Sequence, residues 1–218
     1  MAAAGHPEDK QSLSNPNSFK YRGKITLVDS GEILDRAARF ISAEKVLGFD
    51  VETKPSFKKG EVHPPALMQI ATFKEVFLIR LLKFDWFEIL KPVLESETTI
   101  KAGIGILDDV RKLLSAGRFL PAGFVEIGQL ARKTGCQKSS LKYLAKEIMG
   151  LEISKKSRLT NWEKTVLTED QIAYAAADAY LSRELFLRLR VKYREAFDEP
   201  VIFCKFPSEP LLQGRGPS

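Results

Sequence analysis

Residues 46–52 read V-L-G-F-D-V-E, a short apolar run that carries two acids. Such a run predicts a central β-strand. Asp50 and Glu52 are two positions apart, so in a strand both side chains point to one face, while Val51 points to the other. Two acids about 7 Å apart along a buried strand repel each other unless a cation lies between them. The alternative is that the strand ends at Phe49 and that water solvates both acids.

A second polar pair lies late in the chain, in the segment Y-A-A-A-D-A-Y. Tyr174 and Asp178 are four residues apart, so they share one face of a helix. The alanines around them allow this helix to pack closely on another element, such as the sheet that carries Asp50. A phenol one turn before an acid is placed to hold a water beside a metal bound by that acid. An ordinary helix with a buried tyrosine hydrogen-bonded to an aspartate fits the same spacing.

A further acid lies between these two segments. Asp109 falls in the first turn of a helix predicted directly after the strand T-I-K-A-G-I-G, residues 99–105. A negative charge suits a helix N-terminus, and this is the simplest role for the neighbouring Asp108. The apolar residues that follow supply a stripe for the core, so this helix is expected to pack on the sheet.

The rest of the chain predicts alternating strands and helices, and therefore an α/β domain with a mixed sheet and helices on both faces. Three side-chain caps are predicted for helices, from Ser30, from Asp85 with Glu88, and from Thr168 with Gln171. Beyond the strands at 46–52 and 99–105, strands are predicted at 24–30, 64–72 and 75–81, and helices at 32–42, 84–96, 106–117, 139–150 and 169–197.

The cysteines and histidines restrict the chemistry. Cys136 and Cys204 lie far apart and in no metal-binding spacing, and His6 and His63 are the two histidines. Zinc sites built from these residues are therefore nearly excluded, as is Ser-His-Asp catalysis unless His63 serves. If the protein is a metal enzyme, its ligands are oxygen atoms, which favour Mg²⁺ or Mn²⁺.

The chain is predicted to hold one domain at residues 21–205, between a disordered leader at 1–20 and a flexible tail at 206–218. No apolar run approaches the roughly 20 residues of a membrane span, and the N-terminus does not resemble a signal peptide. Separated, reduced cysteines fit an intracellular protein. We therefore expect no membrane association and a cytoplasmic location, or a nuclear one in a eukaryote. The sequence does not indicate an oligomeric state.

The formal charge of +6 suits a nucleic-acid partner but also fits a plain basic enzyme. Basic clusters flank both predicted site segments, where they are placed to follow a phosphate backbone or simply to be solvated. Phe57 and Trp162 are candidates for stacking on bases, although burial in the core is the simpler expectation for Trp162. The basic residues are Lys54, Lys58 and Lys59 in the first cluster, and Lys155, Lys156 and Arg158 in the second.

The motifs form an ordered set: D-x-E on a strand, an acid after a G-x-G strand–helix junction, and Y-x-x-x-D in a late helix. This order resembles the DEDD-type 3′–5′ exonucleases of the tyrosine subclass. The stretches P-A-L-M-Q-I-A-T and L-T-N-W-E-K-T-V-L-T-E-D-Q-I-A-Y-A-A-A-D-A-Y also resemble that family. The resemblance covers residues 24–195, and Ala173 stands where the histidine subclass would carry its base.

The resemblance implies an RNase H-like fold and hydrolysis of phosphodiester bonds with two Mg²⁺ or Mn²⁺ ions. By motif position, Asp50 bridges both ions, and Glu52 and Asp178 bind the ion that holds the attacking water. Asp109 supports the second ion, and Tyr174 orients the water.

Two further assignments by resemblance rest on the residues next to a motif. The V-R-K-L pattern that follows Asp109 favours this residue over Asp108 as the family's middle acid. Thr53, directly after the D-x-E pair, is expected to contact the terminal nucleotide.

The predicted function is release of nucleoside monophosphates from the 3′ end of single-stranded or 3′-overhang nucleic acid. A basic surface serves DNA and RNA alike, so the sequence leaves the choice open. Two alternatives stand beside this function: a catalytically weak nucleic-acid-binding module on the same fold, and another two-metal nuclease such as an endonuclease or resolvase.

Overall fold

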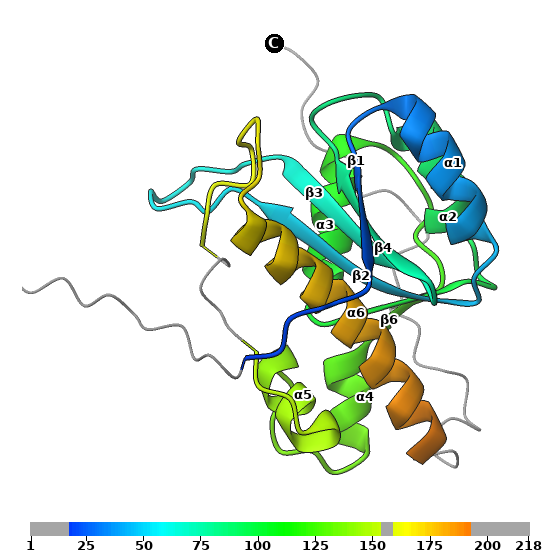
Figure 1. Ribbon diagram of the computed structural model, residues 1–218, viewed down its shortest axis with the longest axis vertical. Helices are drawn as coiled ribbons and strands as arrows, with labels where there is room; N and C mark the ends of the chain where they lie inside the picture. The colour runs from blue at the N-terminus through cyan, green and yellow to red at the C-terminus, as the bar shows by residue number, and fades with distance from the viewer. Residues whose placement is uncertain (1–17, 154–158, 193–218) are drawn as a thin grey trace, which may run out of the picture.

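The computed structural model describes residues 18–153 and 159–192. Their centre is a six-stranded mixed sheet in the order β1-β4-β3-β2-β5-β6 (Figure 1). The three middle strands β4, β3 and β2 pair antiparallel, and the outer pairs β1·β4, β2·β5 and β5·β6 are parallel. The strands are β1 (Lys24–Val28), β2 (Val46–Thr53), β3 (Pro65–Ala71), β4 (Glu75–Arg80), β5 (Ile100–Gly103) and β6 (Phe124–Glu126).

Helices cover both faces of this sheet, as predicted. Helices α1, α2 and α3 pack on one face against alternate strand residues such as Phe49 and Val51. Helix α6 crosses the opposite face over β2 and β3, with α4 and α5 beside it (Figure 1). The helices are α1 (Gly31–Ser42), α2 (Phe87–Leu94), α3 (Ile106–Ala116), α4 (Ile127–Lys133), α5 (Leu141–Met149) and α6 (Glu169–Lys192).

Most local predictions are confirmed. The Ser30 hydroxyl accepts a hydrogen bond from the Ile33 amide at 3.4 Å and begins α1. Thr168 and Gln171 form the predicted capping box of α6, with reciprocal amide-to-side-chain bonds of 3.1 and 3.2 Å. Helix α5 ends at Gly150, whose φ of 71° is the left-handed conformation that favours glycine.

Helix α2 corrects one prediction. It begins at Phe87 with Trp86 at the N-cap, and no side chain caps that position. Asp85 lies one residue before the N-cap, and its carboxylate accepts the Phe87 amide at 3.3 Å. The predicted capping box with Glu88 is therefore wrong, because the chain enters the helix one residue later than the polar pattern suggests.

Two short elements were not predicted, strand β6 and helix α4. Three residues are too few to show an alternating pattern, and the seven residues of α4 span about two turns. The predicted leader and tail lie outside the described residues, apart from residues 18–20, and so does the predicted extension of the last helix beyond Lys192. Within the described ranges, no helix has the length and apolarity that a membrane crossing requires.

Helix α6 approaches β2 very closely at Gly48. A Cβ atom added to Gly48 would lie 1.9 Å from the Ala179 carbonyl oxygen and 2.9 Å from the Cβ of Arg183. Arg183 also donates from Nε to the Val46 carbonyl oxygen at 3.2 Å, and so ties the helix to the start of the same strand. The helix backbone therefore rests on the strand backbone two residues before Asp50.

Replacing Gly48 with alanine tests this contact. We expect Gly48→Ala to lower the free energy of unfolding by about 3 kcal/mol, because a backbone carbonyl has to move to admit the methyl group. Urea unfolding followed by circular dichroism measures the change. Gly31→Ala is the matched control, since a Cβ there meets no atom within 4 Å, and its effect should stay within about 1 kcal/mol. Equal effects of the two substitutions would contradict the close approach.

Candidate active site

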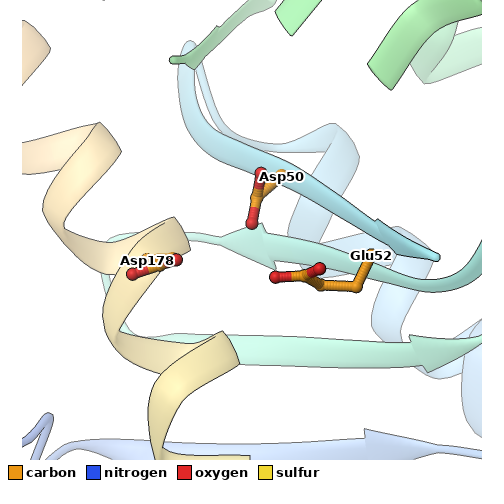
Figure 2. Close-up of side chains that lie close together, drawn as sticks. All are labelled: Asp50, Glu52 and Asp178. Carbon is orange, nitrogen blue, oxygen red and sulfur yellow. The ribbon is translucent and has the colours of Figure 1, made fainter. Parts of the chain in front are cut away.

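Three carboxylates meet between the sheet and α6. Asp50 and Glu52 project from the same face of β2, and Asp178 projects from α6 towards them (Figure 2). One oxygen of each lies within 4.8 Å of an oxygen of the other two. Strand β2 continues to Thr53, so the alternative in which the strand ends at Phe49 is wrong.

The three acids repel one another. Burial raises the pKa of Glu52 from its ordinary 4.5 to about 9, with further contributions from the charges of Asp50 and Asp178. A carboxyl group with that pKa keeps its proton at neutral pH unless a cation replaces it. The cluster therefore favours a cation in its centre.

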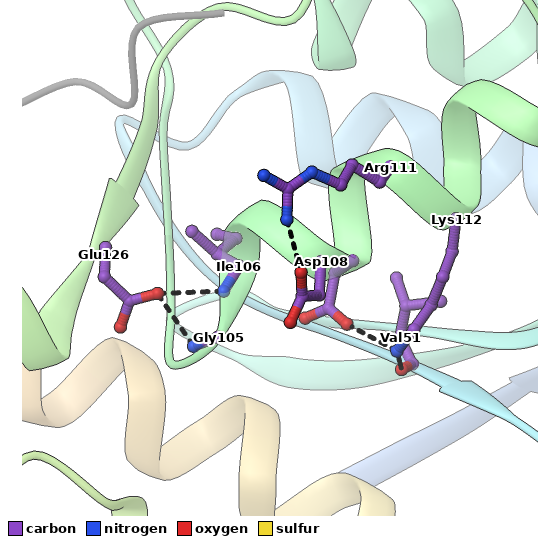
Figure 3. Close-up of polar contacts among 8 residues, drawn as sticks. Val51, Gly105, Ile106, Asp108, Arg111, Lys112 and Glu126 are labelled. Atoms are coloured by element: carbon purple, nitrogen blue, oxygen red, sulfur yellow. Dashed lines mark hydrogen bonds and ion pairs between the residues drawn. The ribbon is translucent and has the colours of Figure 1, made fainter. Parts of the chain in front are cut away.

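Asp109 lies on α3 at the edge of this cluster. It is 4% exposed, and burial raises its pKa well above the ordinary range, followed by the effect of Asp50. Its Oδ1 lies 3.0 Å from the ammonium of Lys112, which also donates to the Val51 carbonyl oxygen at 3.3 Å (Figure 3). Its Oδ2 is buried and has no hydrogen-bond partner in the part of the chain that the structure describes.

Asp108 occupies a different environment. Its side chain is 74% exposed at the rim of the cleft and pairs with Arg111 at 2.6 Å (Figure 3). Because consecutive residues of a helix point in different directions, Asp109 faces inward beside Asp50 and Asp108 faces solvent. The assignment of the catalytic role to Asp109 stays a prediction.

Glu126 fixes the start of α3 and was missed by the sequence reasoning. Its Oε2 accepts hydrogen bonds from the amides of Gly105 and Ile106 at 2.8 and 3.0 Å (Figure 3). Its Oε1 accepts the amide of Gly128 at 3.0 Å, at the start of α4. One carboxylate on β6 therefore holds the first turns of two helices, including the turn that carries Asp109. No local sequence pattern predicts these hydrogen bonds, because Glu126 and Gly105 are far apart in sequence.

Tyr174 lies beside Asp178, one turn earlier on α6. Burial raises the pKa of Tyr174 well above its ordinary value, and the charge of Asp178 and a hydrogen bond to it raise it further. The phenol is therefore neutral at physiological pH and can take part in hydrogen bonds. The ring of Trp162 packs 6.1 Å from that of Tyr174 and is fully buried, which confirms the simpler expectation for Trp162.

An open cleft of about 420 Å³ gives access to the acids. Thr53 and Tyr174 line it, together with Lys112 and Lys142, which the sequence reasoning did not single out. Lys112 follows Asp109 by three residues and so lies on the same helical face, which is a signal that was available. Lys142 comes from the first turn of α5, a segment that only the fold brings to the site.

The predicted substrate-binding lysines that the structure describes are not among the residues that line this cleft, although Thr53 and Pro55 on either side of Lys54 are. Lys54 pairs with Glu163 at 3.8 Å, and neither Lys54 nor Lys58 is among the residues that line the cleft. Phe57 is 81% exposed on the same loop. Lys155, Lys156 and Arg158 lie outside the described residues.

The donor set fits hard divalent cations. All four acids offer carboxylate oxygens, which are the ligands that Mg²⁺ and Mn²⁺ prefer. The buried Oδ2 of Asp109 and the raised pKa of Glu52 both mark places where a cation would compensate an unfavourable arrangement. Asp109 is not part of the three-acid group within 4.8 Å.

The fold is shared with known nucleases and is of the RNase H-like α/β type. The structure of the Aedes aegypti Nibbler EXO domain superposes with a TM-score of 0.74 at 19% identity, covering 82% of this chain and 94% of that one. Escherichia coli RNase D, an exoribonuclease involved in structured RNA processing, superposes with a TM-score of 0.69 at 21% identity, covering 81% of this chain and 48% of that one. The class is thus an RNase H-like domain with an acid-lined cleft.

Sequence comparison names the family within that class. The pattern of the 3′–5′ exonuclease family matches residues 25–194, and the chain belongs to this family. Mouse bifunctional 3′–5′ exonuclease/ATP-dependent helicase WRN is 34% identical over 81% of this chain. Human exonuclease 3′–5′ domain-containing protein 2 is 31% identical over 84%. The matched regions span 13% and 32% of these two relatives.

The raised pKa of Glu52 predicts how pH affects the metal-free protein. Between pH 4.5 and 9 the folded state holds a proton on Glu52 that the unfolded state releases, so stability falls as pH rises through this window. In excess EDTA, we expect the wild type to lose stability relative to Glu52→Gln by up to about 1.4 kcal/mol per pH unit.

Urea unfolding at pH 6, 7 and 8 measures the slope of unfolding free energy against pH for the wild type and for Glu52→Gln. Glu32→Gln is the control, because the Glu32 side chain is 85% exposed and should leave the wild-type slope unchanged. If Glu52→Gln and the wild type had the same slope, Glu52 would not titrate in this range.

Proposed function

We propose that the protein is a 3′–5′ exonuclease that uses two Mg²⁺ or Mn²⁺ ions and releases nucleoside monophosphates from the 3′ end of nucleic acid. The observation that carries this proposal is the meeting of Asp50, Glu52 and Asp178 within 4.8 Å at an open cleft. Membership of the 3′–5′ exonuclease family supports the same activity.

The acids divide into two overlapping ligand sets. Asp50 with Glu52 and Asp178 would hold one ion, and Asp50 with Asp109 would hold the other. Asp50 belongs to both sets because it lies close to the first two acids and also to Asp109. Two divalent ions so held supply activation of a water and neutralisation of charge on the leaving 3′ oxygen. The described part of the site offers no histidine as base, so the carboxylates and the phenol are the groups available to position the water.

Tyr174 serves to orient the attacking water. Its phenol is neutral and hydrogen-bonded to Asp178, which would be a ligand of the first ion. The phenol oxygen, fixed by this donation to Asp178, would accept a hydrogen bond from a water beside Glu52 and Asp178, and this alignment lowers the entropic cost of attack.

The cleft suits the end of a single strand. A volume of about 420 Å³ lies in the range of small-ligand sites and accommodates a terminal nucleotide rather than a duplex. Thr53, Lys112 and Lys142 line it and are placed for the sugar and phosphates. The structure of Trypanosoma brucei RNase D, which shares this fold at 18% identity, has been solved in complex with RNA U12, and this supports a nucleic-acid substrate.

Other basic residues belong to the proposal on sequence grounds. Lys54, Lys58, Lys155, Lys156 and Arg158 flank the two site segments and would follow the phosphate backbone further from the cleft. An intracellular location, cytoplasmic or nuclear in a eukaryote, is proposed from the separated cysteines Cys136 and Cys204.

Digestion of 5′-labelled single-stranded DNA and RNA of one sequence, with Mg²⁺ and with Mn²⁺, tests the activity. We expect stepwise shortening that EDTA abolishes and a circular single strand that stays intact. Asp50→Asn and Asp109→Asn should each lower kcat by about a thousandfold, because loss of a ligand removes about 4 kcal/mol of transition-state stabilisation.

Asp108→Asn is the matched control, and its activity should stay within about threefold of the wild type because Asp108 pairs with Arg111 at the rim. Activity in excess EDTA would refute metal dependence, and cleavage of the circle would indicate an endonuclease. Binding of the oligonucleotide without turnover would indicate a catalytically weak binding module.

Tyr174→Phe tests the orienting role. Removal of one hydrogen bond to a reacting water should cost about 1.5–3 kcal/mol, which corresponds to roughly a 10- to 100-fold fall in kcat. The KM for the oligonucleotide should not change. Tyr180→Phe is the control on the same helix, since Tyr180 packs on Tyr21 and lies outside the cleft lining. An unchanged kcat for Tyr174→Phe would remove the phenol from the mechanism.

A further inference from the structure

A buried amide lies directly beside the central acid of the site. Gln69 on β3 is paired in register with Asp50 on β2. Its chain neighbours Met68 and Ile70 pack with α1, α2 and α3 on the far face of the sheet. Because strand side chains alternate, Gln69 points to the α6 face together with Asp50.

The Gln69 side chain is polar, whereas its position is buried and largely apolar. Gln69 is fully buried, and neither its Nε2 nor its Oε1 has a hydrogen-bond partner among the described residues. Its cross-strand neighbour on the other side is Leu78, which packs with Ala175 and Ala179 of α6. A leucine or methionine would fill this position without leaving polar atoms unsatisfied, so packing does not explain a glutamine there.

Asp50 supplies an explanation. Residues directly opposite on antiparallel strands have Cβ atoms about 4.5–5.5 Å apart, which is within reach of a glutamine side chain. A carboxylate that bridges two ions needs donors or cations around its oxygens, and a ligand's own partners fix its orientation. An amide with two free N–H groups is the donor that such a carboxylate can use.

We propose that Gln69 is a positioning residue that donates a hydrogen bond from its amide to the Asp50 carboxylate when the ions are bound. Gln69 thereby holds Asp50 in the orientation that serves both ligand sets. Its unsatisfied amide is unfavourable in the metal-free protein, and this role explains why a glutamine is nevertheless present. This inference rests on the proposed two-ion function of Asp50.

The test uses Gln69→Met and Gln69→Leu, which keep the approximate size and remove the amide. In EDTA, we expect both variants to have a melting temperature equal to or above that of the wild type. Their dissociation constant for Mn²⁺, measured by calorimetry, should rise about 10- to 100-fold. The kcat on a single-stranded oligonucleotide should fall by a similar factor, with KM unchanged.

Ile70→Val is the matched control on the far face of the same strand. It should lower the melting temperature by roughly 2–4 °C and leave the Mn²⁺ dissociation constant unchanged. A merely structural glutamine would give the reverse for the Gln69 variants, with a lower melting temperature and unchanged Mn²⁺ binding, and that result would overturn the proposal.

The wild-type measurements separate the two hypotheses. If the wild type binds Mn²⁺ and degrades the oligonucleotide while the Gln69 variants match it, the positioning role alone fails. If the wild type neither binds Mn²⁺ nor degrades the oligonucleotide, the proposed function fails and the role of Gln69 fails with it.

Discussion

The contact of helix α6 with strand β2 at Gly48 is the constraint on which the site depends. The Ala179 carbonyl occupies the space that a Cβ of residue 48 would need, so helix and strand meet backbone to backbone. At this separation the short side chain of Asp178 reaches the acids of β2. The alanines around Asp178 and the glycine before Asp50 are therefore part of the active-site geometry, although none carries a functional group.

The same close approach concentrates negative charge in a partly buried place. Burial and mutual repulsion hold the pKa of Glu52 at about 9, and Lys112 compensates Asp109 from one side. The Gln69 amide, opposite Asp50 on β3, has no hydrogen-bond partner in the described part of the chain. These are unfavourable terms in the metal-free protein, and a divalent cation would relieve them together. The stability that the metal-free fold loses at this place would be regained when a cation binds.

The sequence predicted elements well where one local rule was sufficient. Alternation and apolar runs identified β1 to β5, and reciprocal bonding between Thr168 and Gln171 appeared as expected at the start of α6. Prediction failed for β6 and α4, which are too short for periodicity, and for the cap of α2, where the chain turns one residue later. Lys54 pairs with Glu163, a residue that is distant in sequence, and its predicted contact with substrate stays a prediction.

The sequence by itself determined which face of β2 carries Asp50 and Glu52 and which face of α6 carries Tyr174 and Asp178, because strand and helix periods are local properties. It could not bring those faces together. Tertiary packing decided that the two faces meet, that Asp109 turns inward while Asp108 turns outward, and that Glu126 holds the start of α3. It also set Gln69 beside Asp50. The reason is physical: charge repulsion, burial and cross-strand neighbours depend on distances between segments that are far apart along the chain.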